Sequence, residues 1–230
     1  MLKNRIALEI VAKGLGDMLD QFVFVGGTVV ELYASSDTYA ESRQTEDVDC
    51  VVEVASLASY YILEEKLRDL GFYDDMDEDA PICRKRYNGI KVDVMPTNEN
   101  ILQFTNKWYA EGFQNAQNYA LSKDYSIKIL TVPYFIAAKL EAFFSPYRKY
   151  NLDPYASHDF EDIIYILDNC DNILSLIENA NSNVKTYIQQ KFDYLLKNKP
   201  IIYALNGILR DTENEKRVLQ IFESISDPSV

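Results

Sequence analysis

Three aspartates at the start of, or inside, apolar stretches are the residues of this sequence best suited to chemistry. Asp47 and Asp49 lead into Val51-Val52, and Asp93 stands between two valines. Because burying an unpaired carboxylate is costly, Asp49 between Val48 and Cys50 and Asp93 between its two valines each need a partner or an open face. Successive side chains of a strand point to opposite faces, so Asp47 and Asp49 are expected to lie on the same face.

Two such strands lying side by side would bring the three carboxylates together. The carboxylates would repel one another unless cations lay between them, and oxygen-only ligands favour Mg²⁺ or Mn²⁺ over zinc. The pattern therefore predicts a divalent-cation site made by Asp47, Asp49 and Asp93. The competing interpretation is a sheet face with solvated charges, because Asp-any-Asp pairs are common in a chain with 36 acidic residues.

A glycine turn precedes these aspartates in the sequence. Gly26, Gly27 and Thr28 follow the apolar run from Phe22 to Val25. Glycines allow a ligand close to the backbone, and a helix that begins after them presents free N–H groups to phosphate. The segment is neither a P-loop nor a dinucleotide fingerprint, because the lysine and the third glycine are absent. It predicts a phosphate-binding turn, although many ordinary turns look similar.

Charged residues of the later helices form a second, weaker set of candidates. Lys139 lies among the apolar residues of an amphipathic helix. It is either functional, or it lies at the helix edge and extends its ammonium group to solvent. Asp159 and Asp162 are one helical turn apart and share a face, a position that the helix dipole also favours. His158 is the single histidine, and with no Gly-x-Ser-x-Gly segment it is expected at the surface or supporting the site rather than in a hydrolase triad.

Composition limits the architecture and the location of the protein. The 230 residues are 47% hydrophobic, enough for one compact unit or two small packed ones. No apolar run approaches the roughly 20 residues that span a bilayer, and the first residues do not resemble a signal peptide. A cytoplasmic protein without membrane contact is therefore expected. Its three cysteines have no metal-binding spacing and are expected to be reduced thiols.

The net charge of −13 argues against bulk attraction to nucleic acid. Any such contact needs a local basic patch, for which Arg84-Lys85-Arg86 and Arg148-Lys149 are the candidates. The competing interpretation of both segments is ordinary solvated charge.

Hydrophobic periodicity predicts an α+β protein, with a mixed β-sheet in residues 1–132 and a helical domain in 133–230. Asn88-Gly89 predicts a tight hairpin turn, and Ser56 and Gly71 predict the two ends of a helix. The expected strands are 22–25, 47–54, 82–87, 90–95 and 126–132, with a polar loop at 35–43. The expected helices are 2–19, 28–33, 56–70, one beginning at Pro133, one containing 163–167, 184–196, 201–209 and 213–225.

The ordered set of segments resembles the nucleotidyltransferase superfamily of the DNA polymerase beta type. Within it, the chain is most similar to the AbiEii/AbiGii toxin-like nucleotidyltransferases. The segments that carry the resemblance are Phe24-Val25-Gly26-Gly27-Thr28, Arg43-Gln44-Thr45-Glu46-Asp47-Val48-Asp49, Val92-Asp93-Val94, Ala138-Lys139-Leu140-Glu141-Ala142-Phe143, Arg148 and Asp159-Phe160-Glu161-Asp162-Ile163.

This resemblance implies a role for each matched residue. Asp47, Asp49 and Asp93 would be catalytic and hold two Mg²⁺ or Mn²⁺ ions, with Asp93 also activating the attacking hydroxyl. The nucleotide-binding residues would be Gly26, Gly27, Thr28, Arg43, Thr45 and Lys139, with Asp159 and Asp162 in support. The reaction would move an NMP from an NTP to an acceptor hydroxyl, with release of pyrophosphate.

The resemblance leaves the acceptor and the biological setting open. One hypothesis is a toxin of a toxin–antitoxin or phage-defence pair that modifies tRNA and has a cognate antitoxin. A second is transfer to a small molecule of the aminoglycoside type, since an acidic surface attracts cationic aminosugars. A third is a catalytically silent interaction module whose helical part binds a partner.

Overall fold

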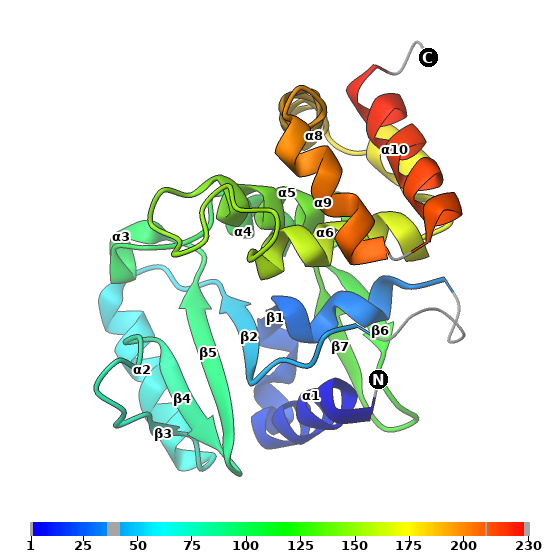
Figure 1. The fold of residues 1–230 in the computed structure, drawn as a ribbon. Coiled ribbons are helices and arrows are strands. Elements are labelled where there is room, and N and C mark those ends of the chain that lie inside the picture. The colour runs from blue at the N-terminus through cyan, green and yellow to red at the C-terminus, as the bar shows by residue number, and fades with distance from the viewer. Residues whose placement is uncertain (1, 36–41, 210, 228–230) are drawn as a thin grey trace. The chain divides into compact units, whose positions relative to one another are not determined.

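The computed structural model describes residues 2–35, 42–209 and 211–227. The chain forms two compact units, one from the described residues of 1–32 and 43–131 and one from those of 33–42 and 132–230. All strands of the described chain lie in the first unit, and the second is helical (Figure 1). The expected α+β class is therefore confirmed. The six residues 36–41 of the expected polar loop lie outside the described part.

The first unit is built on one seven-stranded sheet with the order β3-β4-β5-β2-β1-β7-β6. Its strands are β1 (Phe22–Val25), β2 (Asp47–Val52), β3 (Tyr73–Asp74), β4 (Arg84–Tyr87), β5 (Ile90–Pro96), β6 (Gln117–Ala120) and β7 (Ser126–Ile129). The sheet is mixed, because β2 pairs in parallel with β5 and β1 in parallel with β7, whereas the other pairs are antiparallel.

A two-residue turn joins β4 to β5. Asn88 and Gly89 have φ values of 48° and 81°, as a type I′ turn requires. A turn this short fixes the pairing of the two strands residue by residue, from Tyr87 opposite Ile90 to Arg84 opposite Asp93. The predicted hairpin is confirmed, and its register decides which side chain lies beside Asp93.

Helices of the first unit cover and connect the strands. They are α1 (Leu2–Leu15), the 3₁₀ helices η1 (Gly16–Gln21) and η2 (Gly27–Tyr33, whose last residue is grouped with the second unit), α2 (Leu57–Asp69), α3 (Glu99–Leu102) and α4 (Tyr109–Gln114). Ser56 caps α2 by accepting a 3.2 Å hydrogen bond from the Ser59 N–H, and Gly71 follows at φ +90°, as predicted. The first helix ends at Leu15 rather than at 19, because Gly16 takes φ +51°.

The short or polar elements β3, β6, α3, α4 and, in the second unit, α7 (Ile173–Glu178) were not predicted. Gln117–Ala120 is a polar edge strand without alternation, so its pairing with β7 leaves little trace in the sequence. None of the described helices is long and apolar enough to cross a membrane.

The second unit packs its helices around α5, which is apolar on almost all sides. Its helices are α5 (Val132–Phe144), α6 (His158–Asn169), α7 (Ile173–Glu178), α8 (Ser182–Leu196), α9 (Lys199–Leu209) and α10 (Thr212–Ser226). A helix that is hydrophobic all round belongs in a core, and α6, α7 and α8 all contact it. Aromatic pairs join these helices, with ring centroids 5.2 Å apart for Phe143–Phe160 and 4.7 Å apart for Phe192–Phe222.

Candidate active site

The structure brings the three strand aspartates together. Asp47 and Asp49 lie two residues apart on β2, and Asp93 lies on the parallel neighbour β5, directly opposite Asp49. One carboxylate oxygen from each lies within 4.8 Å of the others. The side chain of Asp93 is 11% exposed and that of Asp47 is 34% exposed, so the cluster has a buried side and an open side.

The glycine turn closes against this cluster. Gly26 follows β1 at φ +74°, and a Cβ there would overlap the Asp49 carboxylate. A Cβ on Gly27 would overlap the guanidinium of Arg43 and the methyl group of Thr45. A side chain on Gly26 would therefore displace the Asp49 carboxylate, and one on Gly27 would displace Arg43 or Thr45, which explains why this turn needs glycine.

Thr28 ties the turn to the beginning of β2. Its hydroxyl donates to the backbone oxygen of Asp47 at 2.5 Å and shares a 2.9 Å hydrogen bond with the Thr45 hydroxyl. Asn4 of α1, which the sequence analysis did not consider, donates to the Arg43 carbonyl at 3.1 Å and accepts from the Thr45 N–H at 3.3 Å. These hydrogen bonds hold the backbone from Arg43 to Asp47 in place. The one sequence signal was helical spacing, because Asn4 lies four and seven residues before the apolar Leu8 and Val11, which are buried.

Arg84 of β4, which the sequence suggested only as part of a basic patch, lies beside the aspartates. Its Nε donates to Oδ1 of Asp93 and its Nη2 to Oδ2 of Asp93, both at 2.7 Å, and Nη2 also donates at 3.1 Å to Oδ2 of Asp47. The hydrogen bonds to Asp93, followed by the negative charges of Asp93, Asp47 and Asp49, raise the pKa of Arg84 above its already high ordinary value. The register signal was available, because counting outward from Asn88-Gly89 places Arg84 opposite Asp93.

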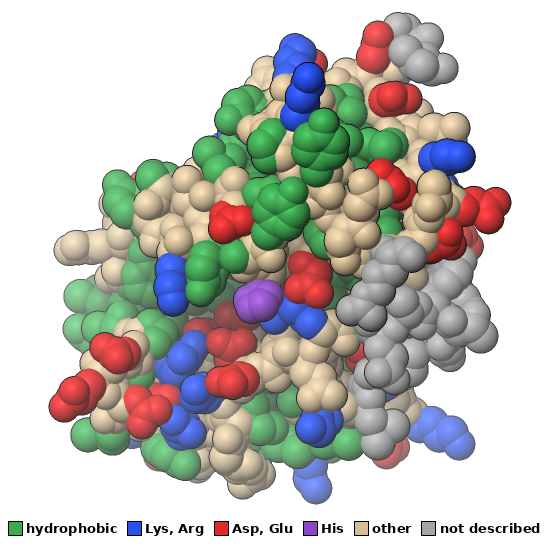
Figure 2. All heavy atoms as spheres, in the orientation of Figure 1, with side chains coloured by type: hydrophobic (Ala, Val, Ile, Leu, Met, Phe, Trp, Pro, Cys, Tyr) green, Lys and Arg blue, Asp and Glu red, His purple; other side chains and the backbone are tan. Residues whose placement is uncertain are grey.

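The other two cations of the basic run, Lys85 and Arg86, also form ion pairs within the first unit. Lys85 is buried with Nζ against Glu64 and Asp74, and Arg86 pairs with Asp75 at 3.0 Å and Asp77 at 2.7 Å. Lys85 is therefore buried rather than solvated, and both cations pair with carboxylates of the same unit. Figure 2 shows acidic and basic side chains interleaved over the strands β3, β4 and β5.

In the second unit, Lys139 is held by the two aspartates of α6. Its Nζ lies 3.0 Å from Asp159 and 2.7 Å from Asp162. Burial by itself lowers the pKa of Lys139, but the charges of Asp162 and Asp159 outweigh it and leave the pKa above the ordinary lysine value. His158 is 67% exposed, with Nδ1 3.5 Å from Glu161.

A separate hollow of about 840 Å³ lies in the first unit beyond the carboxyl ends of β2 and β5. Its lining includes Glu53, Thr97, Asn98 and Lys107 and none of the predicted site residues.

Comparisons with known proteins agree with this geometry. The profile of a family described as "Nucleotidyl transferase AbiEii toxin, Type IV TA system" matches residues 14–225. The fold is similar to the crystal structure of an antigenic nucleotidyltransferase-like protein from Paracoccidioides brasiliensis. That similarity has a TM-score of 0.50 at 13% identity and covers 91% of this chain and 97% of that chain. A comparison with curated proteins finds no match.

Proposed function

Because the chain belongs to the AbiEii family of nucleotidyltransferase toxins of type IV toxin–antitoxin systems, we propose that it transfers an NMP from an NTP to a hydroxyl of a tRNA. The family implies an NTP substrate and a cognate antitoxin. The observation that carries the proposal is the convergence of Asp47, Asp49 and Asp93 beside the turn at Gly26. The division into a catalytic domain at 1–132 and a helical domain at 133–230 remains a prediction.

The donor set of this cluster fits the divalent cations that nucleotidyl transfer uses. It offers only carboxylate oxygens, the ligands that Mg²⁺ and Mn²⁺ prefer, at separations short enough to share ions. Two cations held by Asp47, Asp49 and Asp93 would supply the positive charge that stabilises the attacking and leaving oxygens of an in-line displacement. In our proposal, Asp93 also accepts the proton of the attacking hydroxyl.

The nucleotide phosphates are proposed to lie against the glycine turn. With no Cβ at Gly26 and Gly27, charged groups approach this backbone closely, and the Arg43 guanidinium beside Gly27 supplies positive charge for the phosphates. Thr28 and Thr45 support this turn through their shared hydrogen bond. Lys139, positioned by Asp159 and Asp162, is proposed as a further contact to the triphosphate.

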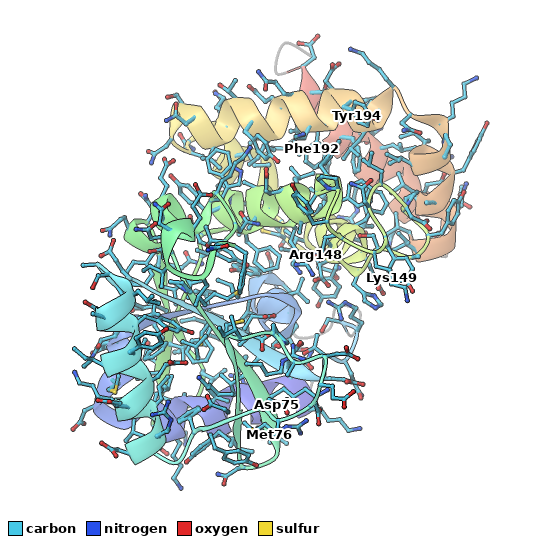
Figure 3. All side chains as sticks on the ribbon, turned by 90° about the vertical axis from the view of Figure 1, so that its left-hand side faces the viewer. Asp75, Met76, Arg148, Lys149, Phe192 and Tyr194 are labelled. Carbon is cyan, nitrogen blue, oxygen red and sulfur yellow. The ribbon has the colours of Figure 1, made fainter. Side chains whose placement is uncertain are left out.

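A tRNA acceptor is supported by the segment that follows α5. Tyr147 is 97% exposed and Tyr155 is 68% exposed, and the exposed Arg148 and Lys149 lie between them in the sequence (Figure 3). The Lys149 ammonium lies 5.1 Å from the centre of the Tyr150 ring. Exposed aromatic rings interleaved with cations suit unpaired RNA, whose bases stack on the rings while its phosphates meet the cations.

The reaction is tested by incubating the protein with each α-labelled NTP, Mg²⁺ or Mn²⁺, and total tRNA. Wild type should label tRNA, whereas the Asp47→Asn/Asp49→Asn variant should not. Asp79→Asn, which removes an exposed carboxylate outside the cluster, should retain full activity. If the double variant were as active as wild type, the cluster would not be the site of transfer.

The acceptor is tested separately from the reaction. Tyr147→Ala/Tyr155→Ala should raise the KM for tRNA by about thirtyfold or more, since each of the two lost stacking contacts is worth about 1–3 kcal/mol. Tyr203→Ala removes a 62% exposed ring from α9 of the same unit and should leave the KM unchanged. Transfer of label to an aminoglycoside, with none to tRNA, would instead favour the small-molecule hypothesis that the charge of −13 suggests.

A further inference from the structure

Arg84 donates hydrogen bonds to the same carboxylate oxygens that would bind cations in the proposed function. Its two hydrogen bonds to Asp93 form the parallel, bidentate pair that is the strongest arrangement of a guanidinium with a carboxylate. The third bond reaches Asp47 on the neighbouring strand β2, so that one side chain joins both strands of the cluster. The Arg84 side chain is only 18% exposed, which limits screening of these contacts by solvent.

The position of Arg84 beside Asp93 is set by the pairing of β4 with β5 and not by a flexible loop. The tight turn at Asn88-Gly89 sets Arg84 directly across from Asp93, and the flanking Lys85 and Arg86 are anchored by their own acidic partners. Three carboxylates this close together need positive charge to offset their repulsion. The guanidinium supplies such charge from within the chain.

We propose that Arg84 is the internal counter-ion of the cluster and competes with divalent cations for the oxygens of Asp93 and Asp47. Without cations it keeps the carboxylates together in the arrangement that binding needs. A cation that binds Asp93 meets a positive charge already bonded to both oxygens, so the guanidinium must move away. Arg84 therefore lowers the affinity of the site for free cations. This inference rests on the proposed function, because it requires Asp47, Asp49 and Asp93 to be the cation ligands.

Binding of Mn²⁺ in the absence of nucleotide and acceptor gives a test that does not depend on activity. The free Mn²⁺ signal in electron paramagnetic resonance would be followed for wild type, Arg84→Ala, Arg84→Lys and Arg86→Ala. Arg86→Ala is the matched control, because it removes the same charge from the same strand but its ion pairs are with Asp75 and Asp77. In Figure 3, Asp75 lies on the loop between β3 and β4.

The expected result is that Arg84→Ala binds Mn²⁺ about tenfold more tightly than wild type, a usual size for coupling between two binding events. Arg84→Lys keeps the charge but cannot make the bidentate pair, so its affinity for Mn²⁺ should lie between those of wild type and Arg84→Ala. The affinity of Arg86→Ala should equal that of wild type. If Arg84→Ala is unstable without cations, Mn²⁺ should raise its melting temperature by more than that of wild type. If wild type bound Mn²⁺ as tightly as Arg84→Lys does, or more tightly, the proposal would be overturned.

Displacement itself is followed with diamagnetic Mg²⁺. The ¹⁵N–¹H signal of the Arg84 Nε, assigned by its loss in Arg84→Lys, should shift as the site fills, whereas that of Arg86 should stay. An unmoved Arg84 signal at saturation would overturn the proposal and leave the proposed function intact. If neither wild type nor Arg84→Ala binds Mn²⁺ more tightly than Asp47→Asn/Asp49→Asn, the cation site and this inference fail together.

Discussion

Gly26 and Asp49 approach each other so closely that no side chain fits between them. Val25 at the end of β1 pairs with Asp49 of β2, and the chain then turns at Gly26 with φ +74°. A Cβ on Gly26 would overlap the carboxylate of Asp49. The glycine turn and the acidic cluster are therefore one structural unit, and a change in the turn must displace an aspartate.

We predict that Gly26→Ala abolishes cation binding and nucleotidyl transfer while the protein still folds. The alanine would displace the Asp49 carboxylate, and the left-handed backbone would cost about 1–2 kcal/mol of stability. Mn²⁺ binding and thermal unfolding measure the two effects. Gly71→Ala is the control, because Gly71 has φ +90° but its Cβ would lie at an ordinary 3.7 Å from Tyr87. It should lose similar stability and bind Mn²⁺ as wild type does.

Lys139 is predicted to stabilise the second unit whether or not it also binds nucleotide. Lys139→Met would leave Asp162, whose side chain is 2% exposed, without its cation. Removing one partner of a buried ion pair costs about 3–5 kcal/mol, which urea unfolding in the absence of ligands would measure. Lys139→Met/Asp162→Leu should recover most of this loss. Equal stabilities of Lys139→Met and wild type would show that the pair contributes nothing.

The carboxylates and the glycine turn could be found from the sequence because their signals are local. An aspartate within a run of valines is unusual over a few residues, and two glycines become informative when they follow a strand and precede a helix. The parallel pairing of β2 and β5 then aligns Asp49 with Asp93. The class of the fold followed from similar local periodicity, with β-patterns early in the chain and helical patterns later.

Contacts that depend on strand register were missed. Arg84, Lys85 and Arg86 look alike as a run of cations, yet alternation sends Lys85 to the opposite face from its neighbours. Their acidic partners come from β2, α2, β5 and the segment of residues 74–77, which no single stretch of sequence brings together. The hairpin turn carried enough information to place Arg84, but Glu64 and Asp74 could be assigned only from the fold.

Lys85→Met is predicted to destabilise the first unit by about 3 kcal/mol at neutral pH, because Glu64 would stay largely buried without its partner. The hydrogen bond from Lys85 lowers the pKa of Asp74 below 3.8, its ordinary value. A lowered pKa stabilises the fold above the unfolded pKa, and this stability is lost as the pH falls through the folded pKa. The difference between wild type and Lys85→Met should therefore shrink as the pH falls below about 4 and on through the lowered pKa of Asp74.

Urea unfolding at several pH values measures this difference. Arg68→Met is the control, since Arg68 also faces Asp74, at 3.8 Å, but both side chains are about half exposed. That pair should contribute about 1 kcal/mol or less at any pH. A difference between wild type and Lys85→Met that did not change with pH would show that Lys85 does not act through Asp74.

The three cysteines are predicted to resist thiol reagents in the folded protein. All are unpaired and buried, and burial raises the pKa of Cys50 well above its usual range and that of Cys83 to about 12. Because the thiolate is the reactive species, Ellman's reagent at pH 8 should label all three only after unfolding. Tyr147→Cys, at a 97% exposed position, should add one rapidly labelled thiol and so confirm that the reagent works. Rapid labelling of the wild-type protein would mean that the strands around Cys50 and Cys83 open far more often than this packing allows.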